Sequence, residues 1–180
     1  MNYQVIYESQ SGNTARLAKE IAACLPKEHT KLVDINAQKP TLDADVYCIG
    51  FCVHHSICSM RMVELLELLN GKVVLLFATC GMNPTQSYHD VLERNVTPFL
   101  PDTCDYRGFF LCQGAISEDG FAALKRRFES NRDEETLQRF EEFRIDAHDH
   151  PDEKDFEEAR KFVASKLGKA EHKGDIAVSN

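Results

Sequence analysis

Short apolar runs alternate with longer amphipathic stretches along residues 1–113 of the chain. The apolar runs have the length of strands and are rich in β-branched and aromatic residues, and Val73–Phe77 is apolar without interruption. A strand that is apolar on both sides is typical of a parallel sheet covered by helices on both faces. The pattern therefore predicts an α/β fold with five strands, at residues 3–7, 31–35, 46–51, 72–78 and 109–113.

Helices are predicted between these strands and after the last of them. Pro26 ends the first amphipathic stretch, Ser59 is suited to cap the second, and Asn83-Pro84 predicts the start of a third. Pro151 precedes a final helix with acidic residues in its first turn and lysines, Lys166 and Lys169, at its end, which matches the helix dipole. Residues 115–150 contain two more amphipathic stretches, which we expect to be extra helices of the same domain.

Length and composition narrow the class of protein. The 180 residues suffice for one domain, which we expect over residues 1–169, with a mobile polar tail over residues 170–180. The net charge of −8 argues against nucleic acid as the main ligand, because such binding depends on a basic surface, and it leaves a basic protein partner open. No apolar run has the length of a membrane span, and the N-terminus lacks the pattern of a signal peptide. The seven cysteines are scattered without a Cys-x-x-Cys pair, so we expect reduced thiols and a cytoplasmic protein.

The segment of residues 9–14 lies directly between the first predicted strand and the first predicted helix. It contains three hydroxyls and an asparagine but no lysine or arginine, and it matches neither the P-loop pattern nor the dinucleotide fingerprint. Hydroxyls and the free N–H groups of a helix start can bind a phosphate without a cation. The alternative interpretation of this segment is a polar turn that only caps the helix. We expect phosphate binding by Ser9, Gln10, Ser11, Gly12, Asn13 and Thr14.

This segment resembles the T-x-T-G-N-T phosphate loop of the flavodoxin family, and the order of strands and helices resembles the flavodoxin fold. The resemblance spans residues 2–168 and implies a three-layer α/β/α sandwich, with a five-stranded parallel sheet of order 2-1-3-4-5 and extra helices between strand 5 and the C-terminal helix. It also implies that flavin mononucleotide (FMN) binds at the carboxyl edge of the strands. Phe110–Gly114 and His150–Glu153 resemble segments of flavodoxin-like proteins from anaerobic bacteria.

Two further stretches resemble the loops that flank the flavin ring in this family, Gly50–Ser56 after the third strand and Ala78–Met82 after the fourth. The chain has no tryptophan, a residue that often stacks on the ring in flavodoxins. We therefore expect the ring to contact histidine, aliphatic or sulfur-bearing side chains, or to lie partly open. The cofactor contacts implied in these two loops are Cys52, Val53, His54, His55, Thr79, Cys80, Gly81 and Met82.

Several side chains with catalytic or metal-binding potential have two interpretations. His54-His55 can supply a proton or only contact the ring. Cys52, Cys58 and Cys80 can form a redox pair or hold a metal, although small buried apolar side chains are the simpler interpretation. His148-Asp149-His150 can chelate a metal, but it is also explained as the entry to the final helix. We assign no catalytic residue and no metal ligand.

The resemblance implies an FMN-binding redox protein that transfers electrons between protein partners. An acidic protein of this kind suits a redox partner with a basic docking face. The alternative is a flavin-dependent reductase that acts on a quinone, a tetrapyrrole or another planar acceptor, with residues 115–150 covering the ring. A flavodoxin-fold module that has lost the flavin is a third interpretation, which the intact phosphate loop disfavours.

Overall fold

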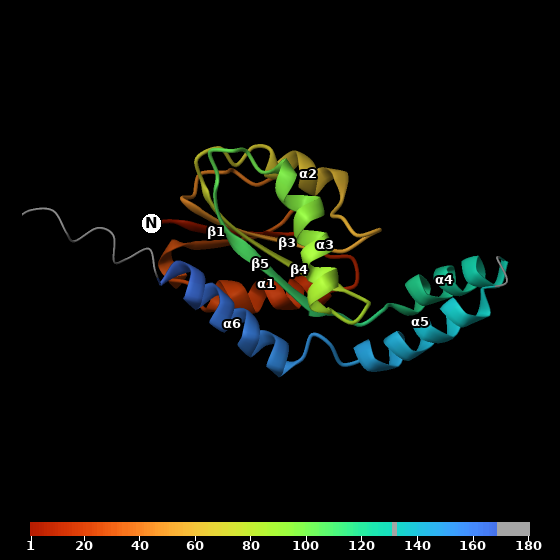
Figure 1. Ribbon diagram of the computed structural model, residues 1–180. Coiled ribbons are helices and arrows are strands. Elements are labelled where there is room, and N and C mark those ends of the chain that lie inside the picture. Colours follow the sequence, from red (N-terminus) through yellow and green to blue (C-terminus); the bar gives the residue numbers. More distant parts are fainter. Residues whose placement is uncertain (131–132, 169–180) are drawn as a thin grey trace, which may run out of the picture.

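One parallel sheet organises the molecule. The computed structural model describes residues 1–130 and 133–168, and its five strands have the order β2-β1-β3-β4-β5 (Figure 1). The predicted positions of the strands are confirmed within a few residues, and the last strand begins four residues earlier than expected. The tail at residues 170–180 and Lys169 lie outside the described residues. The strands are β1 (Tyr3–Tyr7), β2 (Thr30–Asp34), β3 (Val46–Cys52), β4 (Val73–Cys80) and β5 (Asp105–Gln113).

Helices cover both faces of the sheet, which confirms the three-layer sandwich of the flavodoxin fold (Figure 1). The helices α1 and α6 pack on one face, and α2 and α3 pack on the other. None of the described helices is long and apolar enough to cross a membrane. The helices are α1 (Asn13–Ala23), α2 (Met60–Leu66), α3 (Gln86–Val96), α4 (Glu118–Ser130), α5 (Glu134–Ala147) and α6 (Glu153–Leu167), with short 3₁₀ turns at Lys27–His29 and Thr97–Phe99.

Side chains of the central strands alternate between the two layers of the core. Ile6 and Leu76 pack toward α2 and α3, whereas Val5 and Leu75 pack toward α1 and α6. All four are at most 1% exposed, so both faces of these strands exclude water. This burial explains why the strands are apolar without alternation in the sequence.

The start of α2 confirms a capping prediction, the start of α6 has the expected acidic first turn, and the start of α3 differs from its prediction. Ser59 accepts a hydrogen bond from the backbone of Met62 at 3.2 Å, and Asp152 and Asp155 form a reciprocal capping box at the start of α6. The prediction that Asn83 caps α3 was wrong, because Thr85 takes this position and accepts a hydrogen bond from the Tyr88 N–H. The segment Asn83-Pro84 instead forms a turn in which the Thr85 N–H donates to the Asn83 carbonyl.

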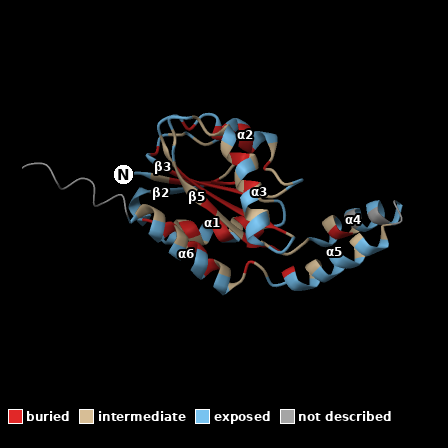
Figure 2. Ribbon diagram, viewed as in Figure 1, coloured by how far each residue is buried: buried red, intermediate tan, exposed pale blue. Residues whose placement is uncertain are grey.

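The two extra helices, α4 and α5, form a hairpin that projects beyond the carboxyl edge of the sheet (Figure 1). They pack mainly on each other: the Arg144 guanidinium lies over the Phe121 ring and pairs with Glu118 at 2.8 Å. The rings of Phe140 and Phe143 meet edge to face. The outward sides of both helices are exposed (Figure 2). The sequence predicted these helices, and the structure shows that they extend away from the sandwich.

Candidate functional site

The phosphate loop, residues 9–14, leaves the end of β1 and turns into α1. Gly12 has a φ of +90°, a left-handed conformation that favours glycine, and its N–H donates to Ser9 Oγ at 3.1 Å. The Gly12 carbonyl then accepts the first helical hydrogen bond from Arg16. A Cβ at position 12 would have no atom within 4 Å, so a ligand can approach the backbone closely here.

The N-terminus of α1 meets the requirements of an anion site. No side chain in the described part of the chain caps it, and its first turn contains no acidic residue. Its first N–H groups and the positive end of the helix dipole therefore face an open position beside the exposed Gln10 and Ser11. These features fit the phosphate group of FMN.

Asn13 and Thr14 point inward and fasten the loop to its neighbours. The Asn13 amide nitrogen donates to Ser11 Oγ at 3.0 Å and to the Ala115 carbonyl at 2.8 Å. The Thr14 and Thr79 hydroxyls share a hydrogen bond of 2.9 Å and are almost fully buried. These side chains hold the loop in place, while their backbone N–H groups belong to the uncapped first turn of α1.

The loop after β3 is a tight turn that presents two imidazoles. His54 and Ile57 exchange backbone hydrogen bonds of 2.9 and 3.1 Å, and His55 and Ser56 between them both have positive φ angles, 50° and 60°. Both histidines are exposed, so either can contact a cofactor or a partner at this edge.

Cys52 and Val53 connect this turn to the sheet. The Val53 N–H donates to the Thr79 carbonyl at 3.0 Å, and Cys52 Sγ lies 3.4 Å from His54 Nε2. Burial, followed by the negative charge of Glu8, raises the pKa of the Cys52 thiol. A protonated thiol is a poor nucleophile and a poor metal ligand.

The loop after β4 contains a second buried thiol. Cys80 Sγ donates to the Met82 carbonyl at 3.2 Å, and burial raises its pKa to about 12. Burial likewise raises the pKa of Cys58 to about 11. Cys52, Cys58 and Cys80 are all free thiols. Their protonated state supports the interpretation that they pack as small apolar side chains. Met82, in contrast, is 37% exposed and lies on the surface of the site.

The segment His148-Asp149-His150 is used in the entry to α6. His150 Nδ1 is paired with Asp155, the residue that completes the capping box with Asp152. His148 pairs separately with Asp149 at 2.8 Å. This arrangement supports the interpretation as a helix entry, because the imidazole of His150 and the carboxylate of Asp155 already satisfy each other.

Two features of the site have no clear sequence signal. Ala115 takes part through its backbone carbonyl, which any residue type would supply. Glu8 at the end of β1 is only 9% exposed, and its Oε2 has no hydrogen-bond partner among the described residues. A carboxylate after an apolar strand reads as a surface residue, so its burial beside the cysteines was not predicted.

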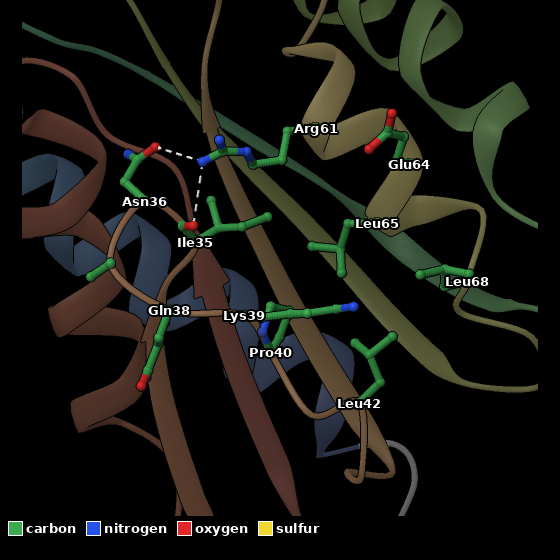
Figure 3. Close-up of a pocket in the computed structure, with 11 residues that line it drawn as sticks. Ile35, Asn36, Gln38, Lys39, Pro40, Leu42, Arg61, Glu64, Leu65 and Leu68 are labelled. Carbon is green, nitrogen blue, oxygen red and sulfur yellow. Dashed lines mark hydrogen bonds between the residues drawn. The ribbon is translucent and has the colours of Figure 1, made fainter.

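A separate hollow of about 530 Å³ lies between α2 and the crossover from β2 to β3 (Figure 3). Arg61 closes one end by donating to the Ile35 carbonyl at 3.4 Å and to Asn36 Oδ1 at 3.3 Å. Leu42 and Leu65 contribute apolar surface, and Lys39 lies along it (Figure 3). None of its lining residues belongs to the predicted cofactor contacts.

Comparisons with known proteins agree with this geometry. A family model described as "Flavodoxin domain" matches residues 4–164. A flavodoxin-like domain-containing protein BilS from Clostridioides difficile is 27% identical, over 94% of this chain and 98% of the relative. A BilS protein from Clostridium symbiosum is 23% identical, over 93% of this chain and 96% of the relative. A flavodoxin structure from Streptococcus pneumonia TIGR4 has a TM-score of 0.58 and 13% identity, over 94% of this chain and 99% of the neighbour.

Both curated relatives come from anaerobic bacteria, which confirms the resemblance noted in the sequence. The solved structure shares the fold. The family match supports FMN as the cofactor of this protein, and the chain belongs to the flavodoxin domain family.

Proposed function

We propose that this FMN-binding redox protein is an electron carrier that transfers electrons between protein partners. The observation that carries the proposal is the exposure of the cofactor edge: His54 and His55 are exposed on one loop, and Met82 is 37% exposed on the next. A partner protein can therefore approach this edge directly. The bound FMN supplies the redox chemistry.

The residues of this chain bind and orient the cofactor in this proposal. The uncapped N-terminus of α1, with Gly12, Ser9 and Ser11, binds the phosphate. The loops after β3 and β4 contact the ring with Cys52, Val53, His54, His55, Thr79, Cys80, Gly81 and Met82. The site then fixes the ring at the carboxyl edge of the sheet, where it is within reach of a docked partner.

The charge distribution supports a partner with a basic docking face. The exposed side of α5, in the hairpin next to the cofactor edge, contains five acidic residues and the single base Arg139. Complementary charge raises the rate of encounter between redox proteins more than it raises their final affinity. The acidic residues are Glu134, Glu135, Glu141, Glu142 and Asp146.

The test is a stopped-flow measurement with two acceptors. The FMN-loaded protein is photoreduced without oxygen and mixed with ferricytochrome c, a basic redox protein, or with menadione, an uncharged quinone. We expect fast oxidation by cytochrome c that slows steeply as salt is added, and a menadione rate that does not depend on salt. Catalytic turnover of NAD(P)H with a quinone or a tetrapyrrole, with no electron transfer to cytochrome c, would refute the carrier and support the reductase.

A further inference from the structure

The base of the α4–α5 hairpin is seated on two of the cofactor loops. The Ala115 carbonyl accepts the hydrogen bond from Asn13 of the phosphate loop, and the Gly114 N–H donates to the Cys80 carbonyl at 2.8 Å. Ile116 packs against Gly81 so closely that a Cβ there would lie 2.7 Å from Ile116 Cγ1. The hairpin is therefore attached at the place where the cofactor binds.

The segment that follows α5, at the other end of the hairpin, is hydrogen-bonded to the same residue, Ala115. The Ala115 N–H donates to the His150 carbonyl at 2.8 Å, so the backbone N–H and the backbone carbonyl of Ala115 are both hydrogen-bonded. His150 is in turn held by Asp155 of the capping box. The position of Ala115 thus decides where both ends of the hairpin lie relative to the sandwich.

The hydrogen bonds of Asn13 show that its side chain is committed to this attachment. An asparagine amide nitrogen has two N–H donors, and here one is used by Ser11 and the other by Ala115. The remaining side-chain atom is an oxygen, which cannot donate to a phosphate. Asn13 is 8% exposed, so this arrangement is shielded from water. Its backbone N–H, however, belongs to the first turn of α1, where the phosphate binds.

We propose that Asn13 is a positioning residue that couples FMN binding to the placement of the α4–α5 hairpin. The phosphate fixes the backbone of the phosphate loop, the Asn13 side chain transmits this order to Ala115, and the base of the hairpin is held more firmly on the cofactor loops. Coupling between two sites is reciprocal, so the attached hairpin also increases the affinity for FMN. This inference rests on the proposed function, because it requires FMN to bind at the phosphate loop. It adds that the placement of the hairpin depends on bound FMN.

Hydrogen exchange followed by mass spectrometry measures this coupling directly. In the wild-type protein, saturation with FMN should slow amide exchange in residues 118–130 and 133–147 by about five- to tenfold, which is within the usual range of coupling between sites. The helix α3 serves as an internal reference. Exchange in the hairpin is a readout that a purely local phosphate contact would not change.

Two variants disturb the contact from opposite sides. Asn13→Ala removes the donor, and Gly114→Ala places a Cβ 3.0 Å from the Asn13 amide nitrogen while leaving the sequence of the phosphate loop unchanged. In both variants we expect the effect of FMN on hairpin exchange to disappear and FMN affinity to fall by about five- to tenfold. The double variant should be no worse than the more severe single one, because both remove the same contact. Asn70→Ala, an exposed asparagine before β4, is the matched control.

Each outcome decides the proposal. Circular dichroism first establishes that each variant is folded, and each is saturated with FMN before exchange is measured. If FMN leaves hairpin exchange unchanged in the wild type, or still slows it in both variants, the coupling through Asn13 is refuted. Failure of electron transfer to cytochrome c would instead refute the carrier proposal and leave this measurement intact.

Discussion

A negative charge at position 12 should abolish tight FMN binding, and the structure separates this effect from backbone strain. Gly12 has a φ of +90°, which disfavours other residues, although a side chain there would meet no atom within 4 Å. Gly12→Asp and Gly12→Asn have nearly the same shape, and both residue types tolerate left-handed backbone better than most. They differ in charge alone, so their comparison isolates the electrostatic contribution.

The magnitude follows from Coulomb's law. Two unit charges about 4 Å apart near a protein surface repel each other by about 4 kcal/mol, which corresponds to a factor of about a thousand in affinity. Ser11 and Gln10 beside Gly12 are exposed, so solvent reduces the repulsion. We therefore expect Gly12→Asp to bind FMN at least about a hundredfold more weakly than Gly12→Asn.

The assay is titration of each apo-protein with FMN and with riboflavin, followed by the quenching of flavin fluorescence. Riboflavin lacks the phosphate, so its weaker binding should be nearly the same in the two variants. Thermal unfolding checks that both variants have similar stability. Equal FMN affinity in Gly12→Asp and Gly12→Asn would show that the phosphate binds elsewhere.

Three further predictions address the surroundings of the site. Thr14→Val or Thr79→Val alone leaves a buried hydroxyl without its partner and should cost about 1–3 kcal/mol in denaturant unfolding, whereas the double variant should cost less than the sum of the two. Burial and the charge of Glu8 raise the pKa of Cys52, so its alkylation by iodoacetamide should be slow at neutral pH and accelerate as the pH rises. Bound FMN should suppress this alkylation, which peptide mass spectrometry measures. An alkylation rate that is insensitive to FMN would exclude Cys52 from the cofactor site. The backbone N–H of Asp155 holds the pKa of Asp152 below its ordinary value of 3.8, so the ionised form stabilises the folded protein above that pH and its contribution is lost as the pH falls below it. Asp152→Asn should therefore melt at a lower temperature than the wild type near neutral pH, and the difference should vanish in acid.

The sequence predicted the sheet well because burial leaves a strong pattern. Leu75 and Leu76 face opposite layers of the core, so both must be apolar, and the resulting run could be recognised without any structure. The turn at residues 9–14 was equally recognisable, because Gly12 has a left-handed φ of +90° that favours glycine.

The parts that escaped prediction depend on backbone atoms or on competition between equivalent residues. Asn83 and Thr85 are both good helix caps, and only the turn at Pro84 decides in favour of Thr85. The contact from Asn13 to Ala115 joins residues 102 positions apart in the sequence. The acceptor is a backbone carbonyl, so the residue type at position 115 gives no sign of the contact. The amphipathic pattern of residues 115–150 revealed two helices but not that they would pack on each other and leave the sandwich.

The attachment of the hairpin changes how the acidic residues of α5 should be understood. An acidic residue in the last turn of a helix opposes the helix dipole, so Asp146 is not explained by the stability of α5. The C-terminus of α5 leads through His150 to Ala115 and hence to the phosphate loop, which brings this charge close to the cofactor edge. If FMN fixes the hairpin through Asn13, it also fixes the acidic surface that a basic partner would meet. The salt dependence of electron transfer to cytochrome c should then be weaker in Asn13→Ala saturated with FMN than in the wild type, and an unchanged dependence would mean that the hairpin takes no part in docking.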